Sequence, residues 1–372
     1  MMNLAEYRRT ASRLADFLPW VALVGQGAVL NKDGSFQRTA RFRGPDLDSA
    51  VAAELVAVAG RLNNAFRRLG SGWAIFVEAQ RHEASTYPES RFPDPASALV
   101  DAERKADFEE AGSHYISSYF LTFTYLPPAE DAARTEAWLY EGRDRAGVDP
   151  HEVLHGFIDR TDRVLSLLDG FMPECGWLDD AETLTYLHSC VSTNRHRVRV
   201  PETPIYLDAL LADQPLTGGL EPRLGNSHLR ILTIVGFPTA TTPGILDDLN
   251  RLAFPYRWST RAILLDKTDA TKLLTKIRRQ WFAKRKSIGA ILKEVMTNEA
   301  SALVDTDAAN KAADADLALQ ELGADYAGQA YVTATITVWD SDPNIADEKL
   351  RLVEKVIQGR DFTAMAETIN AV

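Results

Sequence analysis

The sequence has little cysteine and no segment suited to crossing a membrane. Only Cys175 and Cys190 occur among 372 residues, so a disulfide scaffold and a Cys-x-x-Cys metal or redox pair are both excluded. The longest apolar stretch, from Phe17 to Leu30, contains Pro19 and is shorter than the roughly 20 residues of a transmembrane helix. The first residues also lack the apolar core of a signal peptide. These absences favour a reducing compartment, and we expect the protein to be cytoplasmic.

Nucleotide-binding loops are also missing from the sequence. None of the 22 glycines is followed by lysine, so no Gly-x-x-x-x-Gly-Lys-Ser/Thr loop is present to cradle phosphates. Gly25 and Gly27 resemble the start of a dinucleotide fingerprint, but Leu30 replaces its third glycine and the segment that follows is predicted to be a strand. We therefore expect no catalytic residue, no bound cofactor and no metal site in this chain.

Positive charge is in deficit over the chain as a whole. Lys and Arg number 41 against 52 Asp and Glu, which gives a net charge of -11. Nucleic-acid binding requires basic residues over a broad face, so this balance argues against it. The composition, 45% hydrophobic and 25% charged, is typical of a globular chain, and its length suits two or three domains.

Hydrophobic periodicity predicts an α+β fold of mixed sheets with packed helices. Strands are expected at 21–30, 35–43, 73–79, 115–125, 229–237, 256–266 and 330–339. Helices are expected at 47–69, 96–111, 150–168, 180–194, 244–252, 268–286 and 344–358, with an Ala-rich helical segment at 288–322. The order of the last third, two strand–helix–strand passages around a helical excursion, predicts a split βαβ, ferredoxin-like unit with an inserted long helical hairpin.

These patterns also predict how the chain is divided into domains. The expected divisions are an amphipathic N-terminal helix at 1–20, a first α+β subdomain at 21–145, a helical and irregular connector at 146–226, and a second α+β subdomain at 227–372 with its helical insertion near 268–322. The connector owes its irregular stretch, 198–226, to several prolines and glycines.

Two basic helical segments depart from the acidic average. Over residues 4–18, apolar side chains recur every three or four positions and arginines lie off that stripe, which is typical of a helix that docks on a membrane surface or a partner; the alternative is ordinary packing on its own domain. The candidate docking residues are Leu4, Tyr7, Arg8, Arg9, Arg13 and Leu14. The second segment is a candidate subunit contact or, alternatively, a solvated helix face. Its residues are Arg278, Arg279, Trp281, Lys284 and Arg285.

A zinc site is the main alternative function. His151, Glu152 and His155 match His-Glu-x-x-His, in which two imidazoles on one helix face hold zinc and the glutamate acts as a general base. However, Pro150 places His151 in the first helical turn, and Gly156 weakens the helix that the motif requires. A stand-alone zinc-dependent hydrolase therefore remains an alternative, as does a DNA-binding arm, which the net charge disfavours.

Several short motifs together resemble the N-terminal region of the TrbE-type conjugal-transfer ATPases of type IV secretion systems. They are Leu14-Ala15-Asp16-Phe17-Leu18-Pro19-Trp20, Asn31-Lys32-Asp33-Gly34-Ser35, Leu224-Gly225-Asn226-Ser227-His228-Leu229-Arg230, Gly236-Phe237-Pro238, Tyr256-Arg257-Trp258-Ser259-Thr260-Arg261, Arg278-Arg279-Gln280-Trp281 and Glu367-Thr368-Ile369-Asn370-Ala371-Val372. The resemblance spans nearly the whole chain.

This resemblance implies a cytoplasmic protein on the periphery of the inner membrane. Its implied partners are other subunits of the same ATPase in a hexamer, small inner-membrane secretion subunits, and an anionic membrane surface. ATP and magnesium would belong to a RecA-like motor domain expected after Val372, because no position here matches that domain's motifs. The sequence thus predicts an assembly and docking domain that is not an enzyme by itself.

Overall fold

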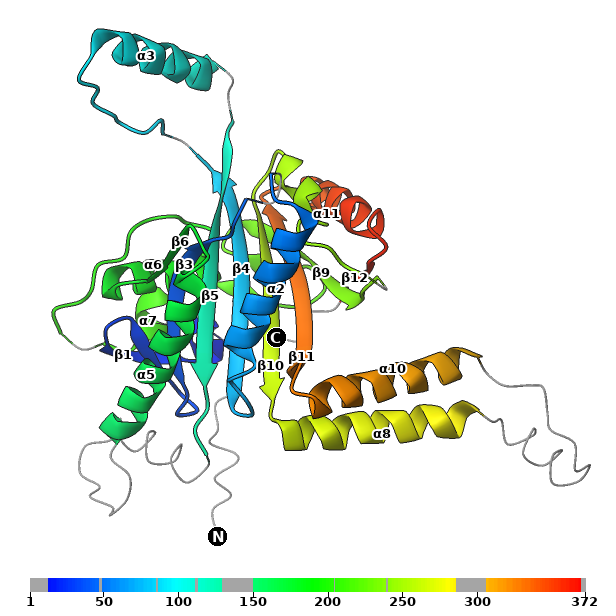
Figure 1. Cartoon of the computed structure of the whole chain (residues 1–372). Helices are drawn as coiled ribbons and strands as arrows, with labels where there is room; N and C mark the ends of the chain where they lie inside the picture. The colour runs from blue at the N-terminus through cyan, green and yellow to red at the C-terminus, as the bar shows by residue number, and fades with distance from the viewer. Residues whose placement is uncertain are drawn as a thin grey trace, which may run out of the picture. The chain divides into compact units, whose positions relative to one another are not determined.

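The fold was derived from a computed structural model of the chain (Figure 1). It describes residues 13–46, 49–84, 86–110, 113–128, 150–203, 205–238, 240–285 and 306–368. Within these ranges no helix is long and apolar enough to span a bilayer.

The twelve strands that the structure describes all belong to one sheet, and the strand pairings identified in it are antiparallel. They are β1 (Trp20–Gly25), β2 (Ala28–Asn31), β3 (Phe36–Arg43), β4 (Trp73–Glu83), β5 (Tyr115–Tyr125), β6 (Glu174–Trp177), β7 (Leu216–Thr217), β8 (Arg223–Leu224), β9 (Ser227–Gly236), β10 (Tyr256–Leu265), β11 (Gln329–Asp340) and β12 (Thr363–Ala366). The order in the sheet is β1-β2-β3-β5-β4-β10-β11-β9-β8-β7, with β12 on β9 and β6 on β3. The expected α+β class is therefore confirmed.

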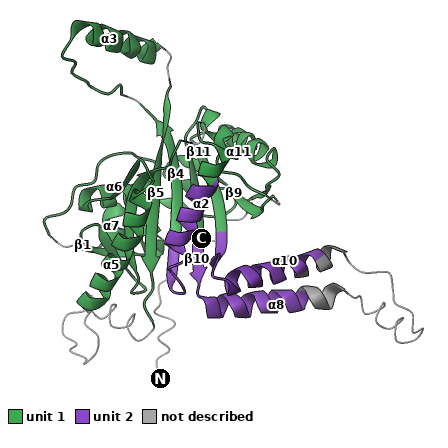
Figure 2. Cartoon of the chain, in the orientation of Figure 1, with its two compact units in different colours: residues 1–55, 75–261, 333–372 green, residues 56–74, 262–332 purple. Residues whose placement is uncertain are grey.

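The helices are of very different lengths. They are α1 (Leu14–Phe17), α2 (Ala52–Phe66), α3 (Pro95–Glu110), α5 (Pro150–Asp169), α6 (Asp180–Val191), α7 (Leu207–Leu211), the 3₁₀ helix η2 (Asp247–Arg251), α8 (Lys267–Arg285), α10 (Thr306–Gly323) and α11 (Pro343–Gln358). Figure 2 shows the two compact units: unit 1 comprises residues 1–55, 75–261 and 333–372, and unit 2 comprises 56–74 and 262–332. The four-fold division expected from the sequence remains a prediction.

In unit 1, α6 and α7 cover part of one sheet face. Asp179 begins α6 with a capping box: its carboxylate accepts from the Glu182 N–H at 2.7 Å, and the Glu182 carboxylate accepts from the Asp179 N–H at 3.1 Å. The helix then buries Leu184 and Leu187 completely. Their neighbours in this core are Leu14, Leu18, Trp20, Val29, Phe120, Leu178, Tyr186, Leu207, Leu211 and Leu224.

The other side of β3 packs on α5. Phe36 stacks on Phe157 with ring centroids 5.8 Å apart. Arg38 is buried, donates to Asp162 on α5 at 2.7 Å, and lies 4.0 Å over the Trp177 ring. Since side chains alternate along a strand, Phe36 and Arg38 reach α5, while Gln37 between them faces the side of α6.

A third core of unit 1 lies between α11 and strands β9 and β11. Asp342 caps α11 by accepting from the Asn344 N–H at 2.8 Å, and Pro343 occupies the first helical turn, where a missing N–H costs nothing. Val353 and Ile357 are completely buried against Ile336. Replacing one such buried side chain with Ala typically lowers the free energy of unfolding by about 2–5 kcal/mol.

Unit 2 contains the helix pair α8 and α10. Ala270 and Leu274 on α8 pack with Leu322 on α10. Arg278 of α8 and Asp316 of α10 form an ion pair at 2.8 Å. Helices α8 and α10 are thus joined both by apolar packing and by an ion pair.

Several elements differ from the sequence-based expectation. The helix expected from residue 47 begins at Ala52, because the Glu54 carboxylate caps it by accepting from the Val51 N–H. The helix expected at 244–252 is the short η2, which starts only after Gly244, whose φ is 78°. Strand β6 and helix α7 were not expected: pairing with β3 holds β6, and two buried leucines anchor α7.

Candidate functional site

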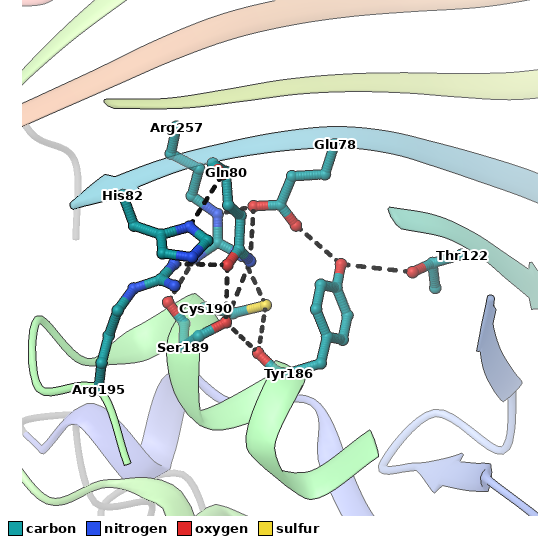
Figure 3. Close-up of polar contacts among 9 residues, drawn as sticks. All are labelled: Glu78, Gln80, His82, Thr122, Tyr186, Ser189, Cys190, Arg195 and Arg257. Carbon is teal, nitrogen blue, oxygen red and sulfur yellow. Dashed lines mark hydrogen bonds and ion pairs between the residues drawn. The ribbon is translucent and has the colours of Figure 1, made fainter. Parts of the chain in front are cut away.

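A polar network lies between α6 and three strands of unit 1 (Figure 3). Glu78 and Gln80 are two residues apart on β4, so both side chains lie on one sheet face, and each is only 4% exposed. Tyr186, Ser189 and Cys190 on α6 meet them from the helix side. The network therefore connects the sheet with the helix that covers it.

The centre of the network is an ion pair between Glu78 and Arg257 of β10. Arg257 also donates to the carbonyl oxygen of Ser189 at 2.7 Å and to the Cys190 sulfur. Burial lowers the pKa of Arg257 to about 9, which still leaves the guanidinium charged at neutral pH. Because an unpaired buried charge is very costly, the two side chains need each other.

The nucleophilic groups of the network are held in their protonated forms. Burial raises the pKa of Cys190 to about 12 and that of Tyr186 well above its ordinary value. Tyr186 donates to Glu78 at 2.8 Å and lies within hydrogen-bond distance of the Thr122 hydroxyl. Since the thiolate is the reactive form of cysteine, Cys190 is held in its unreactive form, and the hydrogen bonds of the network position α6 on the sheet.

The outer end of the network borders a pocket of about 300 Å³. Gln80 accepts a hydrogen bond from Arg195 at 2.9 Å and donates one to Ser189 at 3.0 Å. Partial burial, and then the positive charge of Arg195, lower the pKa of His82. Arg41 and Arg197 complete the basic lining of the pocket.

The predicted docking helix is described only from residue 13 onward, so Leu4, Tyr7, Arg8 and Arg9 lie outside the described residues. Arg13 is exposed, and Leu14 is buried in the core beside α6 and α7. The structure therefore places Leu14 in the chain's own core, and the docking role of the other residues stays a prediction.

The predicted subunit contact lies on α8. Arg278 is paired with Asp316, while Arg279 is exposed. Trp281, Lys284 and Arg285 fall in the helix, but their side chains lie outside the described residues. The subunit-contact role is likewise untested and stays a prediction.

The His-Glu-x-x-His segment begins α5. His151, Glu152 and His155 are all exposed, whereas Leu154 and Phe157 face the core. In the stretches of chain that the structure describes, no group of three or more His, Cys, Asp or Glu side chains is arranged to hold a metal ion. Nothing in this geometry supports the zinc-hydrolase alternative.

The sequence analysis did not single out Glu78, Gln80 and Arg257 as site residues. The alternation of polar residues at positions 78, 80 and 82 on β4 was a usable signal, but such alternation ordinarily indicates a solvent-facing side. Only the packing of α6 makes that side internal. Arg257 lies within one of the family motifs, Tyr256 to Arg261, without its role being evident.

Comparison with known proteins agrees with the resemblance noted in the motifs. Residues 27–133 match the family described as type IV secretion system ATPase VirB4/TrbE, N-terminal domain. The chain is 31% identical to the conjugal transfer protein TrbE of Rhizobium radiobacter, over all of this chain and 47% of that protein. It is 39% identical to the first of the separate pieces of a probable conjugal transfer protein TrbE of Sinorhizobium fredii, over 37% of this chain and 93% of that relative. The chain belongs to the VirB4/TrbE family.

More distant members of the VirB4/TrbE family cover less of their own length. The type IV secretion system protein virB4 of Brucella suis is 25% identical over 71% of this chain and 34% of that protein. The chain therefore spans about half of the Rhizobium TrbE and about a third of this VirB4. Its polar network lies partly within the matched region, on β4 and β5, and partly beyond it, on α6 and β10.

Proposed function

We propose that this chain is the assembly and docking domain of a TrbE-type secretion ATPase and that it is not catalytic by itself. The observation that carries this proposal is the helix α3. None of its 16 residues is buried, and Leu99 and Val100 are 62% and 48% exposed. Because an isolated helix of this length is only marginally stable in water, a partner surface over α3 would stabilise it.

The partner we propose for α3 is a second copy of the chain. Helix α3 carries five acidic residues against two basic ones, whereas α8 carries seven basic residues against one acidic residue. Within unit 1, Phe108 of α3 contacts the rings of Tyr87 and His114, and Asp101 accepts a hydrogen bond from Tyr87 at 2.8 Å. Complementary charge then directs α3 of one protomer toward α8 of another. In this proposal the subunit contact is formed by the α8 residues expected from the sequence, Arg278, Arg279, Trp281, Lys284 and Arg285.

Reciprocal charge reversal tests this contact. Glu103→Arg on α3 or Arg279→Glu on α8 is expected to shift the chain toward monomer in analytical ultracentrifugation, and an equimolar mixture of the two variants is expected to regain association. Glu348→Lys, an exposed acidic position on α11, is the matched control. If the Glu103 variant keeps the wild-type oligomer distribution, the contact is wrong.

The N-terminal segment is proposed to dock on an anionic membrane or on small inner-membrane secretion subunits. Arg8, Arg9 and Arg13 are its candidate contacts, since lysine and arginine near a membrane surface are attracted to anionic lipids. Reversing these three charges is expected to move the full-length protein from the membrane fraction to the soluble fraction. Unchanged fractionation would remove this element of the proposal.

Two further elements of the proposal concern the motor and the fold. ATP and magnesium would serve a motor domain of the longer protein, inside a hexamer, and not this chain. Strands β9 to β12 are proposed to form a ferredoxin-like split βαβ unit, which the order β12-β9-β11-β10 supports, with α8 and α10 inserted between β10 and β11. Cooperative unfolding of an isolated 227–372 fragment would support that unit, and a molten fragment would count against it.

A further inference from the structure

A basic pocket in unit 1 is independent of the proposed subunit contact. It opens between strands β3, β4 and β5, helix α6 and the segment that follows α6. Its basic side chains are Arg41 from β3, His82 from β4, and Arg195 and Arg197 from the segment after α6. The convergence of four such residues from three separate segments of the chain on 300 Å³ of space is the starting observation.

Little negative charge balances these side chains. Glu182 is the only carboxylate among the described lining residues, and it lies 3.8 Å from Arg41 while its other oxygen caps α6. Among the described residues, no carboxylate lies within ion-pair distance of Arg195 or Arg197. The pocket therefore carries a net positive charge even with His82 neutral.

The scaffold holds Arg195 in place without neutralising it. Gln80, which is 4% exposed, accepts one hydrogen bond from Arg195 at 2.9 Å and is itself held by Ser189. This leaves other guanidinium N–H groups of Arg195 available. Partial burial of its guanidinium lowers the pKa of Arg195, although the residue as a whole is exposed. Ser118 adds a hydroxyl to the same lining.

We propose that this pocket binds a phosphate group. Guanidinium forks match the geometry of phosphate oxygens and bind them with charge-assisted hydrogen bonds. Arg195 and Arg197 clamp the anion from the loop side, and Arg41 and His82 face it from the sheet. The phosphate reaches the pocket either as a free phosphate compound or as the headgroup of an anionic lipid.

Calorimetric titration with pyrophosphate tests the site on the intact chain. We expect sub-millimolar binding that Arg195→Gln and Arg197→Gln each weaken at least tenfold. Arg251→Gln is the matched control, because Arg251 lies in the same unit, is 86% exposed and does not line the pocket. Thermal unfolding of each variant checks that it is folded. No heat of binding at millimolar pyrophosphate, or equal affinity of the Arg195 and Arg251 variants, would overturn the proposal.

A second readout reports on the pocket directly. Bound phosphate offsets the charge of Arg195, so the pKa of His82, followed by its ring NMR signals, is expected to rise on addition of pyrophosphate and to stay unchanged with chloride at equal ionic strength. If the pKa of His82 does not change when pyrophosphate is added, that result would contradict binding in this pocket.

Lipid vesicles distinguish the two sources of the phosphate. Vesicles of phosphatidylglycerol that compete with pyrophosphate, and lose binding in the Arg195 variant, would assign the site to a headgroup. Binding of pyrophosphate without competition from these vesicles would assign it to a free phosphate compound. The assembly test on α3 and α8 uses other residues, so its failure leaves this result untouched.

Discussion

The Tyr186 hydroxyl on α6 donates a 2.8 Å hydrogen bond to the Glu78 carboxylate on β4, across 108 positions of sequence. The same carboxylate pairs with Arg257 on β10. One buried acidic group thus ties two strands that are distant in sequence to the helix that covers them. This relationship makes the network a determinant of how unit 1 is assembled.

Arg257→Met is expected to destabilise the chain by about 3–5 kcal/mol, because it leaves the Glu78 charge buried and unpaired. Tyr186→Phe removes one hydrogen bond to a charged group and is expected to cost about 2 kcal/mol. Urea unfolding followed by tryptophan fluorescence measures both. If Arg257→Met unfolds at the same urea concentration as the exposed-site variant Arg251→Gln, the ion pair contributes nothing to stability.

Gly27→Ala is expected to destabilise the hairpin of β1 and β2 far more than Gly25→Ala. Gly27 adopts a φ of 71°, and an added Cβ would lie 2.4 Å from the Leu178 carbonyl oxygen, whereas a Cβ at Gly25 meets nothing within 4 Å. Left-handed backbone strain alone costs about 1–3 kcal/mol. Thermal unfolding of the two variants, two residues apart, compares them directly; equal melting temperatures would refute the steric argument.

Both cysteines are expected to be nearly inert in the folded chain. Burial, and then Asp169, raise the pKa of Cys175 to about 11 from an ordinary value of 9.0. At pH 8 this lowers the thiolate fraction about a hundredfold, and the thiolate is the form that reacts. Labelling with a chromogenic disulfide reagent should therefore be slow in buffer and fast in urea. The Cys190→Ser variant isolates Cys175, and rapid labelling of that variant in buffer would contradict the prediction.

Acid is expected to loosen the segment that carries Arg195. Burial by itself would raise the pKa of Asp213, but interactions with His188, Ser192 and Asn194 outweigh it and lower the pKa below its ordinary 3.8. His188 Nε2 lies 3.0 Å from the Asp213 carboxylate, in an electrostatic contact without aligned hydrogen-bond geometry. A carboxyl group with a lowered folded-state pKa stabilises the fold above its unfolded value, and this contribution is lost as the pH falls through the folded value.

Asp213→Asn tests that linkage. The variant is expected to be less stable than wild type at pH 7, with the difference shrinking as the pH falls below about 4. Urea unfolding at several pH values measures the difference. Asp342→Asn is the control variant, because it alters the cap of α11 instead. We expect it to leave the rate of amide hydrogen exchange in the segment that carries Arg195 unchanged. A difference between Asp213→Asn and wild type that is independent of pH would exclude the proposed linkage.

The elements with strong local signals could be predicted from the sequence. Helix α11 has an Asp cap, a Pro in its first turn and an apolar stripe, so its bounds, Pro343–Gln358, differ from the expected 344–358 by one residue at the start. Helices α5 and α6 were also expected close to their observed bounds. Strand β6 and helix α7 were not, because each is only four or five residues long and is held by contacts with distant segments of the chain.

The sequence alone determined the α+β class, the family motifs, the absence of a Gly-Lys phosphate loop and the acidic average, because these are local or compositional properties. Tertiary structure decided which polar side chains are internal. Glu78 and Arg257 lie on strands whose alternation resembles a solvent-facing side, and they become a buried ion pair only because α6 packs over them. It likewise placed Leu14 in the core and gathered Arg41, His82 and Arg195 around one pocket. These contacts could not be predicted from the order of the residues, because they depend on packing between distant segments of the chain. That packing also sets the local dielectric around each charge.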